Sequence, residues 1–255
     1  MLIRVVDLET TGFEAPEHAP CEVAWVDLQH EGIDLSGAPI NWRVDAGSMT
    51  ELLCDPARPI PPETSAVHHI LDEDVKGLRF WPEAIDTCIG EGIFAADVFA
   101  AHNAKFERQW LTDERTGGKP WVCTYKGALR VWPEAPGHSN QALRYWLKPE
   151  GLDRSVAHAA HRAGPDAYVT AFLLRELLKR ASLHDLIKWS SEPALLPRVP
   201  IGQQKGAAWA DVDVGFLKWI LARDFNEDIL HSAHTELERR RDEWRREHAT
   251  ANAST

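Results

Sequence analysis

The chain has 255 residues, with 28 Lys and Arg against 39 Asp and Glu, so its formal net charge is −11 with His neutral. Hydrophobic residues make up 44% and charged residues 26%, a composition typical of a globular protein with a full-sized core. No apolar run approaches the ~20 residues of a membrane helix, no signal-peptide pattern is present, and four scattered cysteines exclude a disulfide scaffold and a cysteine zinc site, so we expect a cytoplasmic protein.

The acidity of the chain constrains any nucleic-acid function. A protein that holds nucleic acid through a broad basic surface carries an excess of Lys and Arg, and this chain carries an excess of Asp and Glu. If it handles nucleic acid, a bound metal ion is the obvious local source of charge to offset phosphate repulsion.

Apolar alternation and turn residues predict an opening antiparallel meander, after which strands alternate with helices. The predicted strands are 1–8, 22–29, 41–45, 96–101 and 121–124. The predicted helices are 63–69, 81–93, 105–111, 140–147 and 156–182. This order indicates an α/β domain with a mixed sheet, over residues 1–187.

The remainder of the chain is predicted to form a small, mainly helical module. Residues 188–200 are rich in Ser and Pro and indicate a linker. The module covers 201–248, with helices at 213–223 and from about 226, and residues 249–255 are expected to be disordered. Arg and Glu interleave over 236–247, which favours a solvated or dimer-contacting helix.

Two carboxylates lie at the end of the first predicted strand. Asp7 and Glu9 are two residues apart, so in a strand both point to the same face. Side by side they repel each other unless protons or cations neutralise them. A metal site and a solvated strand end are both compatible with this pair.

Two further groups of polar residues follow later in the chain. Asn103 is placed to cap a helix whose first turns contain Glu107, where the carboxylate would also favour the helix dipole. Pro165 is tolerated only near a helix start, so we expect His161 on a loop and Asp166 in the first helical turn. Each group taken alone also fits a surface histidine or a helix-end charge.

The order of these groups resembles the DEDDh branch of the 3′–5′ exonucleases, which has a ribonuclease H-like fold. Asp7-Leu8-Glu9-Thr10-Thr11-Gly12 matches the first motif, and His161 stands five residues before Asp166, as in the His subtype. The resemblance spans about 2–178, and 201–237 resembles the small C-terminal module of some relatives in the exodeoxyribonuclease X branch. One position departs from the pattern, because Glu107 stands where the family usually has Asp.

The resemblance implies a mixed five-stranded sheet flanked by helices and a two-metal hydrolysis of phosphodiester bonds. Two Mg²⁺ or Mn²⁺ ions would be held by Asp7, Glu9, Glu107 and Asp166, since hard cations prefer oxygen ligands. His161 would take the proton of the attacking water. The longer arm of Glu107 leaves open whether it ligates metal directly or through water.

The resemblance also implies contacts with the substrate. They would come from Leu8, Thr10, Thr11, Gly12, Phe13, His102, Asn103 and Phe106. Phe13 would stack on a base, although a core position is an equal alternative for Phe13 and Phe106. The expected partner is a DNA 3′ end; RNA trimming, and a non-catalytic binding protein on the same fold, are the alternatives, and a homodimer is suggested by relatives.

Overall fold

The computed structural model of the chain describes residues 1–35, 37, 39–90 and 95–252, without the side chains of 250–252. The described chain divides into two compact units. The first comprises Met1–Ala128 and Ala135–Ser190, and the second comprises Leu129–Glu134 and the chain from Ser191. No helix of the described residues has both the length and the apolar character needed to cross a membrane.

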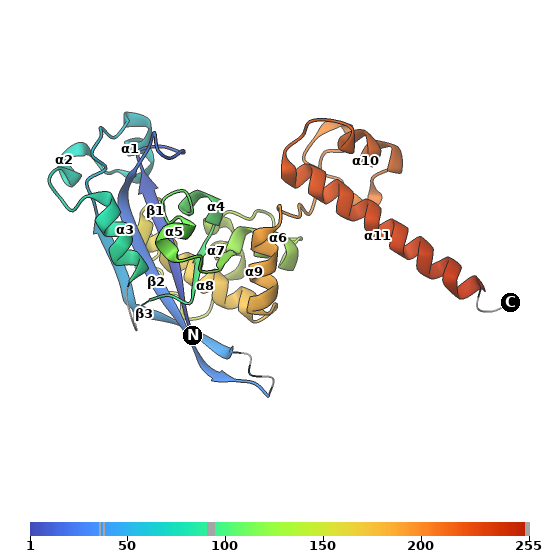
Figure 1. The fold of residues 1–255 in the computed structure, drawn as a ribbon, viewed down its shortest axis with the longest axis horizontal. Coiled ribbons are helices and arrows are strands. Elements are labelled where there is room, and N and C mark those ends of the chain that lie inside the picture. Colours follow the sequence, from blue (N-terminus) through green and yellow to red (C-terminus); the bar gives the residue numbers. More distant parts are fainter. Residues whose placement is uncertain (36, 38, 91–94, 253–255) are drawn as a thin grey trace. The chain divides into compact units, whose positions relative to one another are not determined.

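The first unit is built on a mixed sheet in the order β3-β2-β1-β4-β5 (Figure 1). The strands are β1 (Leu2–Thr10), β2 (Pro20–Ile33), β3 (Pro39–Leu53), β4 (Val98–Ala101) and β5 (Trp121–Cys123). β1, β2 and β3 pair antiparallel, whereas β1 pairs with β4 and β4 with β5 in parallel. β1 lies at the centre of the sheet and is covered on both faces, so it is buried along most of its length although four of its nine residues are polar or charged.

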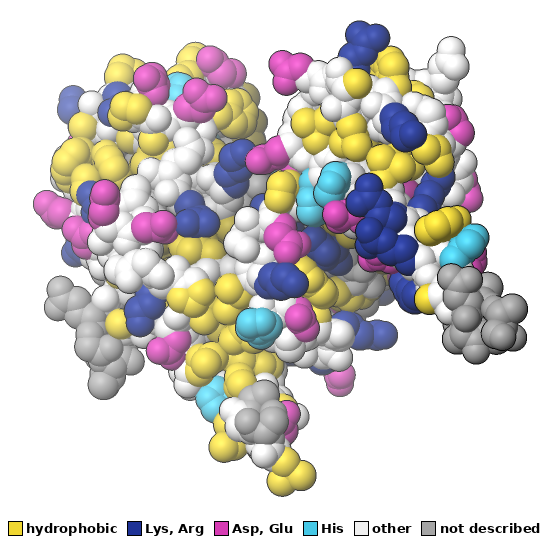
Figure 2. Space-filling view, turned by 45° about the vertical axis from the view of Figure 1, so that its right-hand side comes forward, with side chains coloured by type: hydrophobic (Ala, Val, Ile, Leu, Met, Phe, Trp, Pro, Cys, Tyr) yellow, Lys and Arg dark blue, Asp and Glu magenta, His cyan; other side chains and the backbone are white. Residues whose placement is uncertain are grey.

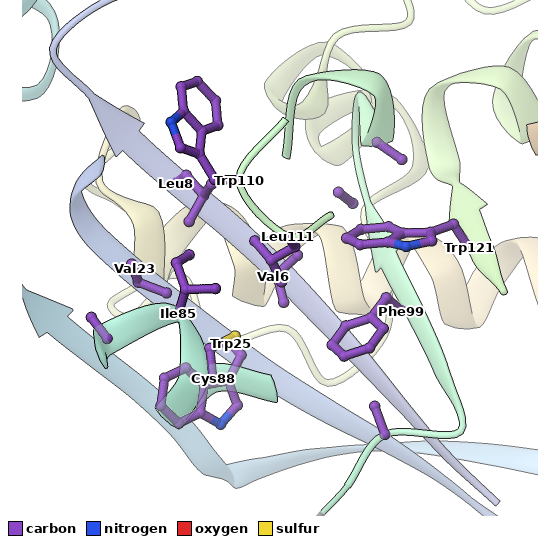
Figure 3. Packing of buried hydrophobic residues seen from close by; sticks show 14 of the residues in the cluster. Val6, Leu8, Val23, Trp25, Ile85, Cys88, Phe99, Trp110, Leu111 and Trp121 are labelled. Carbon is purple, nitrogen blue, oxygen red and sulfur yellow. The ribbon is translucent and has the colours of Figure 1, made fainter. Parts of the chain in front are cut away.

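An apolar cluster packs on one face of this sheet (Figure 3). Val6 and Leu8 of β1 lie in it with Ile85 from the helix α3 (Trp81–Ile89) and with Phe99, whose ring stacks on Trp121 at 5.2 Å between centroids. Side chains alternate along a strand, so Asp7 and Glu9 must point to the opposite face. The burial of Val6 and Leu8 therefore fixes the direction of both carboxylates.

The long helix α8 (Ala163–Leu178) contacts β1, β2 and β3 and is buried over most of its length. The other helices of this unit are shorter. They are α1 (Pro62–His68), α2 (Asp72–Val75), α4 (Ala104–Glu107), α5 (Asp113–Thr116), α6 (Thr124–Val131), α7 (Asn140–Leu147) and α9 (Leu183–Ser191), of which α6 continues into the second unit and α9 ends at its boundary.

The second unit has a small core of its own. It contains the 3-10 helices η2 (Gly202–Gln204) and η3 (Trp209–Asp211) and the helices α10 (Val214–Leu221) and α11 (Glu227–Asn252). Trp209, Leu217, Ile220 and Ile229 are buried together in it. In α11, Glu236 pairs with Arg239 and Arg240 on the same helix, as expected for the interleaved charges.

The predicted fold class is confirmed, and several element boundaries differ. Residues 156–162 form turns rather than helix, because Asp153 accepts hydrogen bonds from the N–H and Oγ of Ser155 and His161 takes a positive φ of 61°. The predicted helix 105–111 keeps only its first turn as α4. β3 is three times longer than the predicted strand 41–45.

Four helices were not predicted, namely α2, α5, α6 and α9. The last of these takes in residues 188–191, which the Ser- and Pro-rich composition had indicated as linker. α11 continues through 249–252, into the segment expected to be disordered, and 253–255 lie outside the described residues. The predicted helix 81–93 ends at Ile89, and its residues 91–93 also lie outside the described residues.

Candidate active site

The site begins at the end of β1. Asp7 and Glu9 point away from the apolar cluster, and the register of β1 and β2 places Glu22 directly opposite Glu9. Residues opposite each other in an antiparallel pair share a face of the sheet. A third carboxylate therefore lies beside the two predicted ones, and it is 1% exposed.

The start of α8 is fastened to the sheet by Glu22. Its carboxylate accepts two hydrogen bonds from the Arg162 guanidinium and one from the Ala163 N–H at 2.9 Å. Gly164 follows, and a Cβ added there would lie 1.7 Å from Oε1 of Glu51. The sheet and the first helical turn thus approach as closely as a glycine permits.

This anchored turn presents Asp166. One carboxylate oxygen accepts the backbone N–H of His161 at 2.8 Å, and the other accepts Nε2 of Gln141 from α7, also at 2.8 Å. Asn140 donates to the Asp166 carbonyl oxygen at 3.2 Å. Asp166 is therefore held in one orientation by two separate elements.

Asp7, Glu9 and Asp166 converge. Each contributes a carboxylate oxygen to a set whose members lie within 4.8 Å of one another. Burial, together with the neighbouring charges of Glu9 and Asp166, raises the pKa of Asp7 well above its ordinary value. Burial and the charge of Asp166 raise the pKa of Glu9 to about 8. Without a nearby positive charge, ionising all three carboxyl groups at neutral pH is energetically unfavourable.

Glu107 lies outside this set of three and lines the same cleft from the end of α4. It is buried, its Oε2 has no hydrogen-bond partner in the described structure, and burial raises its pKa to about 8. A buried oxygen without a donor carries the full desolvation cost of a polar atom. A cation would remove that cost.

These observations fit a divalent metal ion. The donors are all carboxylates, which suit a hard cation such as Mg²⁺ or Mn²⁺. The raised pKa values of the buried carboxyls and the orphaned Glu107 oxygen mark sites of uncompensated negative charge. The set formed by Asp7, Glu9 and Asp166 can therefore hold a metal ion.

The acids open into a cleft of about 450 Å³. Its wall includes His161, which is exposed and whose ring has no hydrogen-bond partner among the described residues. Of the predicted substrate contacts, six line the cleft: Leu8, Thr10, Gly12, Phe13, Asn103 and Phe106. Phe13 is 80% exposed, which excludes the alternative that it belongs to the core. Phe106 packs on Trp110 as well as lining the cleft.

The other two predicted contacts, Thr11 and His102, are not among the cleft residues. The Thr11 hydroxyl accepts the Ala19 N–H at 3.1 Å inside the turn that follows β1. His102 is bonded to Thr124 Oγ1 at 3.0 Å and to the His138 carbonyl at 2.9 Å, and burial lowers its pKa to about 4. Internal hydrogen bonds account for both side chains.

Several residues of the site were missed from the sequence. Glu22, Arg162 and Gln141 position the acids without being among the cleft residues. A glutamate inside the apolar run of β2 was the available signal for Glu22, since a lone buried charge requires a partner. Thr64, Val67 and His68 also line the cleft, and His68 accepts the Ile70 N–H at 3.1 Å.

Comparison with known proteins identifies the family to which this fold belongs. The family model RNase_T, described as Exonuclease, matches residues 5–174. The chain belongs to this exonuclease family. The DEDDh assignment and the ribonuclease H-like fold are thereby confirmed, and the enzyme acts on nucleic acids.

Individual relatives agree with the family. Exodeoxyribonuclease 10 of Escherichia coli strain K12 is 30% identical to this exonuclease over 224 residues, covering 86% of this chain and 90% of that protein. DNA polymerase III subunit epsilon of Treponema pallidum strain Nichols is 29% identical over 182 residues, covering 68% and 74%. The structure of Exonuclease X in complex with 5′ overhanging duplex DNA matches with a TM-score of 0.53 and 28% identity, over 74% of this chain and 99% of that one.

Proposed function

We propose that this exonuclease removes nucleotides from the 3′ ends of single-stranded or frayed DNA and releases nucleoside 5′-monophosphates. The observation that carries the proposal is the convergence of Asp7, Glu9 and Asp166 in a cleft that also contains Glu107 and an exposed His161 imidazole. DNA as the substrate is supported by the names of the relatives, an exodeoxyribonuclease and an exonuclease bound to duplex DNA.

Asp7, Glu9, Asp166 and Glu107 would hold two Mg²⁺ or Mn²⁺ ions. When bound, such ions favour ionisation of water and stabilise negative charge on the phosphate and on the departing 3′-oxygen. His161 would accept the proton of the attacking water at a ring nitrogen, because a neutral imidazole is a suitable base near neutral pH. The backbone N–H of His161 donates a hydrogen bond to the Asp166 carboxylate, so the proposed base and the proposed metal ligand are held close together in space.

Other residues of the cleft would hold the strand. The exposed ring of Phe13 can stack on the terminal base, since aromatic rings bind bases of any sequence. Asn103 and the backbone around Thr10 and Gly12 lie along the same cleft and offer polar groups to the terminal nucleotide.

The first experiment incubates the full chain with DNA and RNA oligonucleotides of one sequence, labelled at either end, with Mg²⁺ and with chelator. We expect immediate release of labelled mononucleotide from 3′-labelled DNA and a ladder from 5′-labelled DNA, in Mg²⁺ only. Preferential degradation of RNA would favour 3′-end trimming of RNA. Binding without degradation of either polymer would favour a non-catalytic role.

A substitution tests the site itself. Asp7→Asn should lower kcat at least a thousandfold, because it removes a central carboxylate and leaves the shape of the site almost unchanged. Glu114→Gln, an exposed acid on α5, is the matched control and should retain wild-type kcat. Circular dichroism would check that both variants fold. Full activity of Asp7→Asn would refute the assignment of the site.

Two further proposals concern the state of the protein. All four cysteines are free and buried, which supports a reducing compartment such as the cytoplasm. A homodimer stays a prediction from the resemblance, and light scattering of the purified full chain tests it.

A further inference from the structure

A second pocket opens beside the C-terminal end of α7, within the first unit. Its volume is about 380 Å³, and it is lined by Arg144, Tyr145, Lys148, Pro149, Leu152 and Arg154. Three of these six side chains are cationic and none is acidic. On a chain of net charge −11, such a concentration of positive charge requires an explanation.

Arg144 forms the inner wall. The residue is 5% exposed, and its guanidinium donates through Nη1 to the Gln141 side chain at 2.9 Å and to the Ala157 carbonyl. Its Nε and Nη2 have no acceptor in the described structure, and the guanidinium carbon lies over the ring of Tyr145, another residue of the pocket, 5.0 Å from the centroid. A guanidinium held in place with free donors is ready to bind an anion.

Lys148 and Arg154 lie at the mouth. Both are exposed, and neither forms an ion pair with any described residue. The nearest acids in the sequence are Glu150 and Asp153, which do not line the pocket. The carboxylate of Asp153 accepts hydrogen bonds from the N–H and Oγ of Ser155. The positive charges of Lys148 and Arg154 are therefore not neutralised by any acidic residue that lines the pocket.

The pocket is connected to the active site through α7. Arg144 bonds to Gln141, and Gln141 bonds to Asp166. The pocket and the cleft are therefore linked by a chain of two side-chain hydrogen bonds.

We propose that this pocket binds a phosphodiester group of the substrate strand, away from the bond that is cut. The inference rests on the proposed function and extends it by assigning a second contact with the strand. The guanidinium and ammonium groups would hold the phosphate, while Tyr145, Pro149 and Leu152 would contact sugar and base. On the face drawn in Figure 2, Lys and Arg side chains are scattered among Asp and Glu, which makes a local site more useful than a broad surface.

The test uses the full chain and equilibrium binding of a 5′-fluorescein DNA single strand in chelator, so that no turnover occurs. Lys148→Gln/Arg154→Gln removes two charges from the pocket. Lys119→Gln/Arg180→Gln removes two charges from exposed positions of the same unit outside it. We expect the first variant to weaken binding about tenfold at low salt and to reduce the slope of log Kd against log salt by about one, and the control to change neither.

A neutral linkage identifies the bound phosphate. A set of oligonucleotides, each with a methylphosphonate at one position, is measured with both proteins. The wild-type protein should lose about tenfold in affinity at one or two internal positions. The pocket variant should show no such loss at those positions, because it lacks the two positive charges that attract the phosphate in the wild-type protein.

Catalytic measurements complete the design. The pocket variant should raise KM for a 20-nucleotide strand at least tenfold more than it raises KM for a chromogenic mononucleotide ester, which has no second phosphodiester. Equal effects on the two substrates, equal affinity loss in the control variant, or an unchanged methylphosphonate profile would each overturn the proposal. Failure of the wild-type protein to degrade any polymer would instead refute the proposed function, while the binding results would still decide the role of the pocket.

Discussion

Glu107 shows how much of the chemistry is set by a single side chain. Its Oε2 is buried without a hydrogen-bond partner, and its pKa is raised to about 8 by burial. An uncompensated carboxylate of this kind destabilises the folded chain. A bound cation would supply the missing partner.

Glu107→Gln tests this explanation. The amide has the same shape and no charge, so we expect the free energy of unfolding of the metal-free variant to be about 1 kcal/mol higher than that of the wild type. We also expect kcat to fall about a hundredfold, because one carboxylate that faces the cleft is lost. Chemical denaturation in chelator and initial rates in Mg²⁺ measure the two effects. Wild-type kcat in this variant would show that Glu107 contributes nothing to metal binding.

At the residue scale, positions of the acids were predictable and their supports were not. The two-residue period of a strand predicts that Asp7 and Glu9 share a face, and Pro165 predicts Asp166 in a first helical turn, whereas only the resemblance to the exonuclease motifs implied that these acids form one site. The bond between Glu22 and Arg162 joins residues 140 positions apart. No local pattern encodes such a pair, so only the folded chain shows it.

At the scale of elements, the start of α8 is the part that assembles the site. Glu22 on β2 holds Arg162 and the Ala163 N–H, and through them fixes His161 on one side and Asp166 on the other. The charge of Arg162 also opposes the rise in the pKa of Glu9 that burial and Asp166 produce. Arg162 is therefore a positioning residue, placed between the sheet and the acids that we propose to bind metal.

Arg162→Ala should weaken Mn²⁺ binding ten- to a hundredfold, the range typical when a supporting partner of metal ligands is lost. Arg162→Lys should recover part of this affinity, because it keeps the charge and loses the two-pronged bond. Arg175→Gln, which breaks an ion pair with Glu176 on the same helix, is the control. Titration calorimetry measures affinity directly. A loss of thermal stability with unchanged Mn²⁺ affinity would reduce Arg162 to a structural role.

The success of element prediction followed the strength of the local signal. β1 and α8 bear long apolar patterns and were found, although the turns held by Asp153 moved the start of α8 to Ala163. α6 and α9 were missed because they follow directly on other elements, and the Ser and Pro of the region around α9 favour a linker. Tertiary packing decided these cases over local propensity.

At the scale of the whole molecule, stability and function are opposed. The chain is strongly acidic, and its candidate active site contains several carboxyls whose pKa values are raised mainly by burial. A carboxyl with a raised pKa binds its proton more tightly in the folded state than in the unfolded state. Its contribution to stability is complete below the ordinary pKa and is lost as the pH rises through the raised one.

The metal-free protein should therefore become less stable as the pH rises from 6.5 to 8. His102, whose pKa is lowered from 6.5 to about 4, acts in the opposite direction, but between pH 6.5 and 8 it changes stability by only about 0.4 kcal/mol. For one proton released, the free energy of unfolding should fall by about 2 kcal/mol over this interval. Denaturant titrations in chelator at a series of pH values measure the slope.

Two comparisons assign this slope to the active site. Glu9→Gln should make the slope shallower, because the variant has no proton to lose at that position, and Glu107, whose pKa is also raised to about 8, should account for part of what remains. A saturating divalent cation should reverse it, since the ion binds the ionised carboxylates of the folded state and its stabilisation grows as the pH rises. If stability in chelator instead rose with pH over this range, or if the cation stabilised the protein equally at pH 6.5 and 8, the acids would not be the repelling, cation-binding group on which the mechanism depends.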